Sequence, residues 1–376
     1  MDLSQAPTPA LVLDHGKLKA NCGRMLARAE ALGVPLRPHM KTLKSIDAAR
    51  LAIDPRHGGI AAATLNEAEY FAGHGIADIQ YAVCITPDKL PRAEAILARA
   101  PRFSFFLDSV ETAEAVADHA RRTGAAFRVW IEIDSGEHRT GVEPESPALL
   151  EIAHALQGSA VVLEGVATHG GHSYGAPDPA GLREVAEQER RAVVRAAERL
   201  RAEGFEVPGV SAGSTPTAMN AVSGEGLTEL RAGVYMAGDL FQAAIGSHAL
   251  NDIAATVLAT VISHNRARNQ IVIDAGGIAL SKDRSTAQLE GRDMGYGLVL
   301  DVEGRPAFGE LIVRGVHQEH GEITAEGPLP FERLPIGAKV RVAPNHICMT
   351  AAAYDRYLVV DDGTAVAEEW GRTNGW

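Results

Sequence analysis

Long apolar runs, a basic excess and paired cysteines are all missing from this chain, and each absence excludes a class of protein. No stretch of 18 apolar residues occurs among the 376, so we expect no membrane-spanning helix. The net charge of -12 disfavours nucleic-acid binding and favours small-molecule partners. The first residues lack the basic and apolar regions of a secretory signal.

Cysteine is scarce, with only Cys22, Cys84 and Cys348. Three widely spaced cysteines do not form a disulfide framework, and they predict a protein of the reducing cytoplasm. Hydrophobic residues make up 46% and charged residues 22%, which is typical of a globular protein with a substantial core. The length predicts two or three domains, or one barrel with an addition.

Short β-like runs alternate with helix-like stretches through the first 235 residues. The expected strands are 34–38, 59–63, 79–84, 103–107, 127–133, 161–167, 208–211 and 228–235. The expected helices are 15–32, 66–74, 87–99, 110–123, 147–157 and 180–203. This alternation predicts a parallel (β/α)₈ barrel of the TIM type. A doubly wound open sheet is the alternative, but the glycine fingerprint expected after its first strand is missing.

The pattern changes after about residue 245, where β-rich segments replace helical periodicity. These segments are 252–264, 270–275, 310–316 and 338–343. They predict a second, mostly antiparallel β domain. We expect the strand Ala10–Leu13 to join it, so that residues 13–245 form the barrel and residues 1–12 and 246–376 form the β domain.

Lys41 stands just past the first expected barrel strand, among Arg37, His39 and Lys44. Active sites of such barrels lie at the carboxyl ends of the strands. A lysine that is desolvated or placed beside other cations has a lowered pKa, which frees its amine to attack carbonyl groups. The alternative is an ordinary solvated basic turn.

Four further polar segments follow expected strands at the same end of the barrel. They are Asp134–Gly141 with Arg139, Thr168–Tyr174 with His169, Ala212–Thr217 with Ser214 and Thr215, and Arg231–Tyr235 with Gly233 and Val234. Small residues with exposed N–H groups and hydroxyls suit a phosphate, and barrels often hold phosphate after strands 7 and 8. Taken singly, each segment also fits a plain turn, a core histidine or an arginine paired with a nearby acid.

A reactive lysine, a phosphate cradle, a histidine and an arginine on one rim together predict a pyridoxal phosphate (PLP) site. In such a site the lysine forms a Schiff base and the cofactor ring acts as an electron sink. We assign Lys41 as catalytic and as the point of attachment. The other expected cofactor contacts are Arg139, His169, Tyr174, Ser214, Thr215, Gly233, Val234 and Tyr235.

The β-rich part contains a candidate metal pair, His346 and Cys348. In an extended segment, residues two apart point to the same side, so both could face one ion. Imidazole and thiolate suit Zn²⁺, or Mn²⁺, Co²⁺ or Ni²⁺ in the same role. Further ligands could come from Asp293, Tyr296, His317, Glu319 and His320, whereas a buried cysteine beside an unrelated histidine is the alternative.

Over nearly its full length the chain resembles the fold-type III PLP enzymes, the group of alanine racemase. Arg37–Thr42 resembles the lysine motif of the branch that contains D-serine dehydratase, D-threo-3-hydroxyaspartate dehydratase and D-threonine aldolase. Asp134–Gly141 resembles the loop whose arginine contacts the phenolic oxygen of the cofactor, and Thr168-His169 resembles the stacking histidine. Arg231–Tyr235 resembles the phosphate strand, with Arg231 near the pyridine nitrogen, and His346-Ile347-Cys348 resembles the metal pair of the dehydratases.

The resemblance implies a metal-activated PLP lyase that converts a D-3-hydroxyamino acid, such as D-serine, D-threonine or D-threo-3-hydroxyaspartate, into a 2-oxo acid and ammonia. One alternative is an aldolase that cleaves such substrates to glycine and an aldehyde. Another is a non-catalytic PLP carrier, although the small carriers of this type lack a β domain. The resemblance also implies a homodimer.

Overall fold

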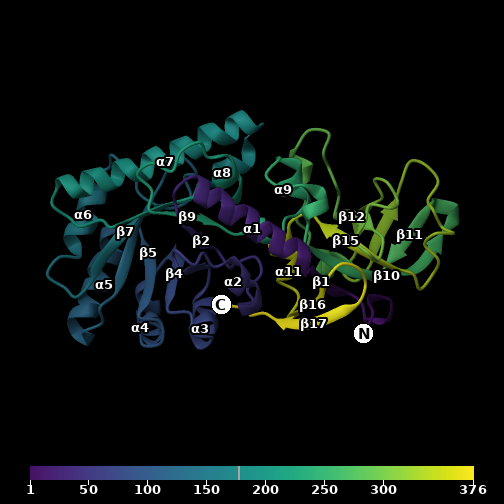
Figure 1. Cartoon of the computed structure of the whole chain (residues 1–376), viewed down its shortest axis with the longest axis horizontal. Helices are drawn as coiled ribbons and strands as arrows, with labels where there is room; N and C mark the ends of the chain where they lie inside the picture. Colours follow the sequence, from purple (N-terminus) through teal and green to yellow (C-terminus); the bar gives the residue numbers. More distant parts are fainter. Residues whose placement is uncertain (177) are drawn as a thin grey trace. The chain divides into compact units, whose positions relative to one another are not determined.

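The computed structural model describes residues 1–176 and 178–376, and its contacts divide them into two compact units (Figure 1). The first, here called the β unit, comprises residues 1–22 and 234–372. The second, the barrel unit, comprises residues 23–233 and 373–376. The borders between the units thus lie at 22/23, 233/234 and 372/373, where the sequence had suggested 12/13 and 245/246.

The barrel unit is built on one sheet of eight parallel strands, in the order β2-β9-β8-β7-β6-β5-β4-β3. The strands are β2 (Leu36–Pro38), β3 (Ile60–Ala62), β4 (Asp78–Cys84), β5 (Arg102–Leu107), β6 (Arg128–Ile133), β7 (Val162–Thr168), β8 (Gly209–Ala212) and β9 (Glu229–Ala232). A parallel bridge between His39 and Ala61 connects the two outermost strands, and Met40 N–H donates to the Ala61 carbonyl at 2.8 Å. The predicted (β/α)₈ barrel is therefore confirmed.

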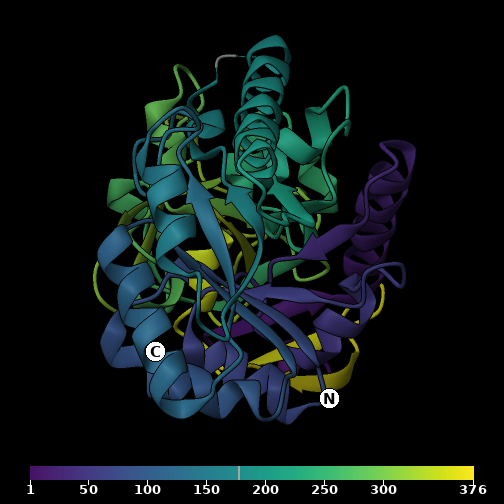
Figure 2. The same ribbon diagram turned by 90° about the vertical axis from the view of Figure 1, so that its left-hand side faces the viewer.

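The helices of this unit lie outside the strands (Figure 2). They are α2 (Ile46–Ala52), α3 (Leu65–Gly73), α4 (Leu90–Leu97), α5 (Val110–Thr123), α6 (Ala148–Ala155), α7 (Pro179–Ala202) and α8 (Thr215–Asn220), and α1 (His15–Ala31) crosses the border between the units. Sequence periodicity missed α2 and α8. Each has at most two turns, which is too few for a helical repeat to emerge. The start of α8 is marked instead by a capping box between Ser214 and Thr217, with Pro216 between them in the first turn.

The strand expected at 228–235 ends earlier than predicted, at Ala232. Residues Val234–Met236 form the 3₁₀ turn η4, and Gly238 N–H donates back to the Val234 carbonyl at 2.8 Å. Gly233 separates the strand from the turn, and a Cβ there would lie 2.6 Å from the His39 carbonyl oxygen. Only glycine permits this close approach between β9 and the segment after β2.

The β unit is a nine-stranded sheet in the order β11-β14-β13-β12-β15-β10-β1-β16-β17. Its strands are β1 (Ala10–Asp14), β10 (Ala255–Asn265), β11 (Gln270–Ile273), β12 (Gly297–Leu300), β13 (Ile312–Val316), β14 (Gly321–Thr324), β15 (Lys339–Pro344), β16 (Arg356–Val360) and β17 (Val366–Gly371). The N-terminal strand β1 pairs antiparallel with β10 and parallel with β16, which confirms that it belongs to this sheet. Strands β12, β14, β16 and β17 were not predicted.

No helix of the described residues is both long and apolar enough to cross a membrane.

Candidate functional site

Lys41 lies in a turn three residues after β2, and its side chain makes no ion pair within the described residues. The neighbouring Lys44 differs, because its Nζ lies 3.0 Å from the carboxylate of Glu67, which is 1% exposed. Arg37 is also paired, to Asp78 and Glu229 inside the barrel. Of the three neighbours predicted to crowd Lys41, the two cations are therefore held by carboxylates. The third, His39, accepts at Nδ1 a hydrogen bond from the Lys41 N–H at 3.3 Å.

Two partly buried histidines lie near Lys41 at the carboxyl end of the barrel. Burial, reinforced by the charges of Lys41 and Arg231, holds the pKa of both His39 and His169 well below the usual range. His169 follows β7, and its Nδ1 lies 3.1 Å from the Gly213 carbonyl after β8. The rim thus presents an unpaired lysine beside two neutral imidazoles, the second of which is the ring expected to lie on a flat cofactor.

The loop after β6 is fixed by its first residue, Asp134. This carboxylate accepts hydrogen bonds from Gly136 N–H at 2.8 Å and His138 N–H at 3.1 Å, and it contacts His138 Nδ1 at 2.7 Å. Arg139 is 55% exposed and pairs with Glu137 at 3.3 Å. Its charge nevertheless contributes to the lowered pKa of His169, so the expected cofactor arginine lies near the expected stacking histidine.

The loops after β7 and β8 are joined by a buried carboxylate from α7. Glu189 Oε1 accepts hydrogen bonds from Gly170 N–H at 2.6 Å and Gly213 N–H at 2.9 Å. Gly213 has φ +133°, and a Cβ there would lie 2.6 Å from the Arg231 carbonyl oxygen, so this position requires glycine. No sequence pattern pointed to Glu189, since a single acid within a charged helix carries no signal.

The remaining residues predicted to bind the cofactor lie on the same loops or on the turn after β9. Ser214 and Thr215 are both 2% exposed, and Ser214 Oγ lies 3.2 Å from Ser173 Oγ in the 3₁₀ turn η3 (Gly171–Gly175). Tyr174 is half-buried in η3. Val234 and Tyr235 are buried in η4, which belongs to the β unit.

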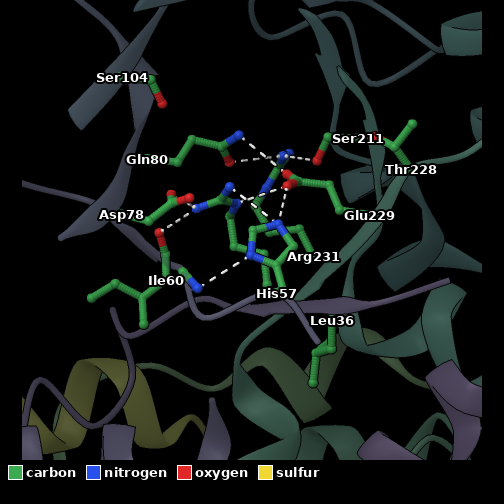
Figure 3. A network of polar contacts seen from close by, with 12 residues as sticks. Leu36, His57, Ile60, Asp78, Gln80, Ser104, Ser211, Thr228, Glu229 and Arg231 are labelled. Atoms are coloured by element: carbon green, nitrogen blue, oxygen red, sulfur yellow. Dashed lines mark hydrogen bonds and ion pairs between the residues drawn. The ribbon is translucent and has the colours of Figure 1, made fainter. Parts of the chain in front are cut away.

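The interior of the barrel contains a polar network, whereas such barrels are usually filled by branched apolar side chains (Figure 3). Arg231 is 3% exposed and donates to Ser211 Oγ at 2.8 Å and to the Thr168 carbonyl at 2.7 Å. Arg37, Asp78, Gln80 and Glu229 fill the layer below. Two period-2 polar patterns within buried strands, Asp78-x-Gln80 and Glu229-x-Arg231, could have revealed this interior.

The predicted metal pair lies in the β unit, but its backbone differs from the prediction. His346 is extended, whereas Cys348 lies in the first turn of α11 (Ile347–Ala351), so the argument from a common extended segment was wrong. The two side chains still approach one another. Burial opposes protonation, but hydrogen bonds to Asp283 and Cys348 raise the pKa of His346 to about 11.

Asp283 is the partner that sequence reasoning missed, and its Oδ2 lies 2.9 Å from His346 Nδ1. An imidazole, a thiol and a carboxylate are a donor set that suits zinc and similar divalent metals. Two of the suggested additional ligands have other partners: Asp293 pairs with Arg284 at 2.5 Å, and His317 lies 3.2 Å from Glu322.

A second group of ligand atoms occurs inside the barrel unit. The side chains of Cys84, Asp108 and Glu132 lie within 4.8 Å of one another, and the Cys84 thiol donates to Glu132 Oε2 at 3.0 Å. Burial and the two carboxylates strongly raise the pKa of this thiol, so it is held as a neutral donor.

Comparison with known proteins gives two family matches in tandem. Residues 13–240 match the model of the alanine racemase N-terminal domain, and residues 254–360 match the "Putative serine dehydratase domain". A D-threo-3-hydroxyaspartate dehydratase of Delftia is 43% identical, over 98% of each chain. A D-threonine aldolase of Arthrobacter is 31% identical, over 98% of this chain and 92% of its own.

A solved structure is also closely similar. It is a cysteine-to-alanine mutant of D-threo-3-hydroxyaspartate dehydratase in the metal-free form, with a TM-score of 0.95, 41% identity and full coverage of both chains.

Proposed function

Because this chain belongs to the alanine racemase N-terminal family, joined to a serine dehydratase domain, we propose that it is a PLP-dependent lyase of D-3-hydroxyamino acids. The proposed reaction removes water and then ammonia and yields a 2-oxo acid. The observation that carries the proposal is Lys41, an amine without an ion-pair partner in the described chain, beside two neutral histidines at the rim of the barrel.

The residues of the rim fit PLP in their chemistry. Lys41 would attach the cofactor, His169 would lie on its ring, and Arg139 would contact its phenolic oxygen. The phosphate and the remaining contacts would fall to Ser214, Thr215, Gly233, Val234, Tyr235 and Tyr174. When bound, PLP supplies an electron sink that stabilises negative charge at the substrate Cα.

Lys41 would also act as the base. With PLP and substrate bound, the Lys41 amine would be placed to take the Cα proton, because an uncharged lysine amine is a competent proton acceptor. His39 and His169 suit this role as neighbours, since neutral rings add no positive charge that would oppose protonation of Lys41. A single base reaching one face of the substrate would explain a preference for D-amino acids.

His346 and Cys348, with Asp283, would hold one divalent metal ion in the β unit. Hydroxide is a poor leaving group, and a divalent metal supplies the Lewis acidity that its departure needs. The metal-free form of the cysteine-to-alanine dehydratase mutant supports a cysteine ligand in that relative. Zinc and Mn²⁺, Co²⁺ or Ni²⁺ are all compatible with these donors.

The second candidate is retro-aldol cleavage, which the similarity to D-threonine aldolase favours. In that reaction the Cα–Cβ bond breaks, and the products are glycine and an aldehyde. The dehydratase remains our proposal because the more similar relative, at 43% identity, is a dehydratase. A mere PLP carrier would not need a metal-ligand set in a β domain.

Incubating the purified protein with D-serine, D-threonine and D-threo-3-hydroxyaspartate, with PLP and each divalent metal, tests this proposal. We expect release of ammonia and a 2-oxo acid from at least one substrate, and none from the L-enantiomers. Glycine and aldehyde in place of ammonia would establish the aldolase. Absence of every product would contradict both.

The proposed setting is a homodimer in the cytoplasm that acts on small D-amino acids and not on nucleic acid or membranes. Cys22, Cys84 and Cys348 form no disulfide within the described residues, which supports a reducing compartment. We expect light scattering to give twice the chain mass of 39.8 kDa at assay concentration. A fully active monomer would contradict this assignment.

A further inference from the structure

Arg231 is a buried cation that makes no ion pair within residues 1–176 and 178–376. Its guanidinium donates only to neutral oxygens, namely Ser211 Oγ and Gln80 Oε1 (Figure 3) and the Thr168 carbonyl. It also lies 5.1 Å from the centre of the Phe106 ring. A buried charge is costly unless it is compensated. Burial lowers the pKa of Arg231, and the nearby carboxylates of Glu229, Glu132 and Glu189 oppose this effect without pairing with it.

The nearest anion in this chain of contacts is Glu229, two residues earlier on β9. Its carboxylate accepts from Arg37 Nε at 2.9 Å and lies 2.8 Å from His57 Nε2. Although burial opposes ionisation, Arg37 and His57 hold the pKa of Glu229 well below its usual range. Glu229 is therefore a fixed negative charge, held in place from below by two cationic or hydrogen-bonding groups.

Two side chains bridge Glu229 to Arg231. Gln80 donates from Nε2 to Glu229 Oε1 at 3.2 Å, and its Oε1 accepts from Arg231 Nη1 at 3.4 Å. Ser211 Oγ accepts from Arg231 Nη1 at 2.8 Å, and the Ser211 side chain lies close enough to Glu229 to help lower the pKa of that carboxyl. Each bridge is a donor towards the anion and an acceptor towards the cation.

The charge of Glu229 fixes the direction of both bridges. An ionised carboxylate only accepts hydrogen bonds, so Gln80 must turn its NH₂ group towards Glu229 and its carbonyl oxygen towards Arg231. A serine hydroxyl has one proton. Because Arg231 only donates, Ser211 Oγ faces it with a lone pair, and the hydroxyl proton is left to point towards Glu229. Glu229 thus orients the dipoles of Gln80 and Ser211, and these dipoles present oxygen atoms to Arg231, which forms no direct ion pair with Glu229.

We propose that Gln80 and Ser211 are positioning residues that hold the guanidinium of Arg231 at the PLP ring nitrogen, and that Glu229 orients them. This inference rests on the proposed function for the identity of the cofactor. Because Arg231 has no direct carboxylate partner, its positive charge stays available to a ligand at the rim. An arginine in a direct ion pair would be partly neutralised and would be drawn towards its partner.

The decisive variant is Gln80→Met, which keeps the length of the side chain and removes both hydrogen-bonding groups. Ser104→Ala is the matched control, since Ser104 is equally buried on β5 but accepts from Trp130 Nε1 and does not contact Arg231. The first readout needs no cofactor: NMR of protein labelled with ¹⁵N-arginine, with the Arg231 signal identified by Arg231→Lys. We expect slowly exchanging guanidinium protons in the wild type and in S104A, and their loss in Q80M.

The second readout uses PLP. In Q80M we expect the pH midpoint of the visible absorbance of bound PLP to move and the PLP dissociation constant to rise about tenfold, as for a lost hydrogen bond to a charged group. Glu229→Gln should move the midpoint in the same direction. If the wild type binds PLP and Q80M matches S104A in both readouts, this inference is wrong and the proposed function stands. If the wild type binds no PLP, the proposed function fails, and the role of this network at a cofactor fails with it.

Discussion

Two lysines three residues apart have opposite surroundings, and this difference gives the first prediction. Lys44 is held by buried Glu67, whereas Lys41 has no ion-pair partner in the described residues. Borohydride treatment of the PLP-loaded protein should therefore fix the pyridoxyl group on Lys41, as read by peptide mapping. Lys41→Ala should bind no PLP covalently, and Lys44→Arg, which keeps the ion pair with Glu67, should behave as the wild type. Labelling of Lys44 would refute the assignment.

The neutral histidines of the rim make the PLP-free protein sensitive to acid. Their pKa values are lowered in the folded protein, so as the pH falls below about 6.5 the unfolded chain takes up protons that His39 and His169 do not. Stability is therefore full above that pH and is lost as the pH falls towards the folded pKa values. The loss is at most about 1.4 kcal/mol per pH unit for each histidine.

Urea unfolding of the PLP-free protein at pH 7.5 and pH 5.5 measures this loss. The double replacement His39→Gln and His169→Gln should lose less stability between the two pH values than the wild type does. His154→Gln, which alters an exposed histidine on α6, serves as the control and should not change the difference. An identical loss in the double variant would show that other groups cause the acid sensitivity.

At the scale of secondary-structure elements, helix α7 does more than pack against the outside of the barrel. Its residue Glu189 hydrogen-bonds the loops after β7 and β8 and so helps to fix their positions. Glu189→Ala would leave Gly170 N–H and Gly213 N–H buried without an acceptor, which should lower the free energy of unfolding by about 2 to 4 kcal/mol. PLP binding should weaken as well, since His169 and Ser214 lie on these loops.

Glu189→Gln retains an acceptor oxygen at the same place and should recover most of the stability and of the PLP affinity. Glu187→Ala is the control on the same helix, because Glu187 pairs with Arg190 and Arg191 on its outer surface. Urea unfolding and PLP titration measure both effects. If E189A resembles E187A, the loops do not depend on this carboxylate.

The elements also show what sequence could and could not predict. Strands such as Phe103–Leu107 and long helices such as α5 and α7 were predicted to within a residue or two, because periodicity and caps are local signals. Lys41, His169 and the His346–Cys348 pair could be placed by motif. The sequence could not predict the roles of Glu189, Asp283 and Gln80. Their roles depend on contacts between residues that lie 19 to 151 positions apart in the chain.

At the scale of the whole molecule, Lys41 and the proposed metal ligands lie in different units of the chain, so their functions should separate experimentally. Lys41 and its neighbours belong to the barrel unit, and Asp283, His346 and Cys348 belong to the β unit. In the proposed mechanism, Cα deprotonation would need only the first set, whereas hydroxide departure would also need the metal. Chelation should therefore abolish ammonia release and leave PLP bound, and a divalent metal should restore turnover.

His346→Ala or Cys348→Ala should give a folded, yellow protein whose rate of ammonia release falls about 10³-fold or more, the expected effect of losing a positioned Lewis acid. These variants should still exchange the Cα proton of a D-amino acid with deuterated solvent. His317→Ala is the control within the same unit, because the exposed His317 side chain lies 3.2 Å from Glu322, whereas His346 pairs with Asp283. Near-normal ammonia release by H346A after exhaustive chelation would remove the metal from the mechanism. The distinction between dehydration and aldol cleavage would then rest on the products alone, because the ligand set that favours loss of the hydroxyl would have no part in the reaction.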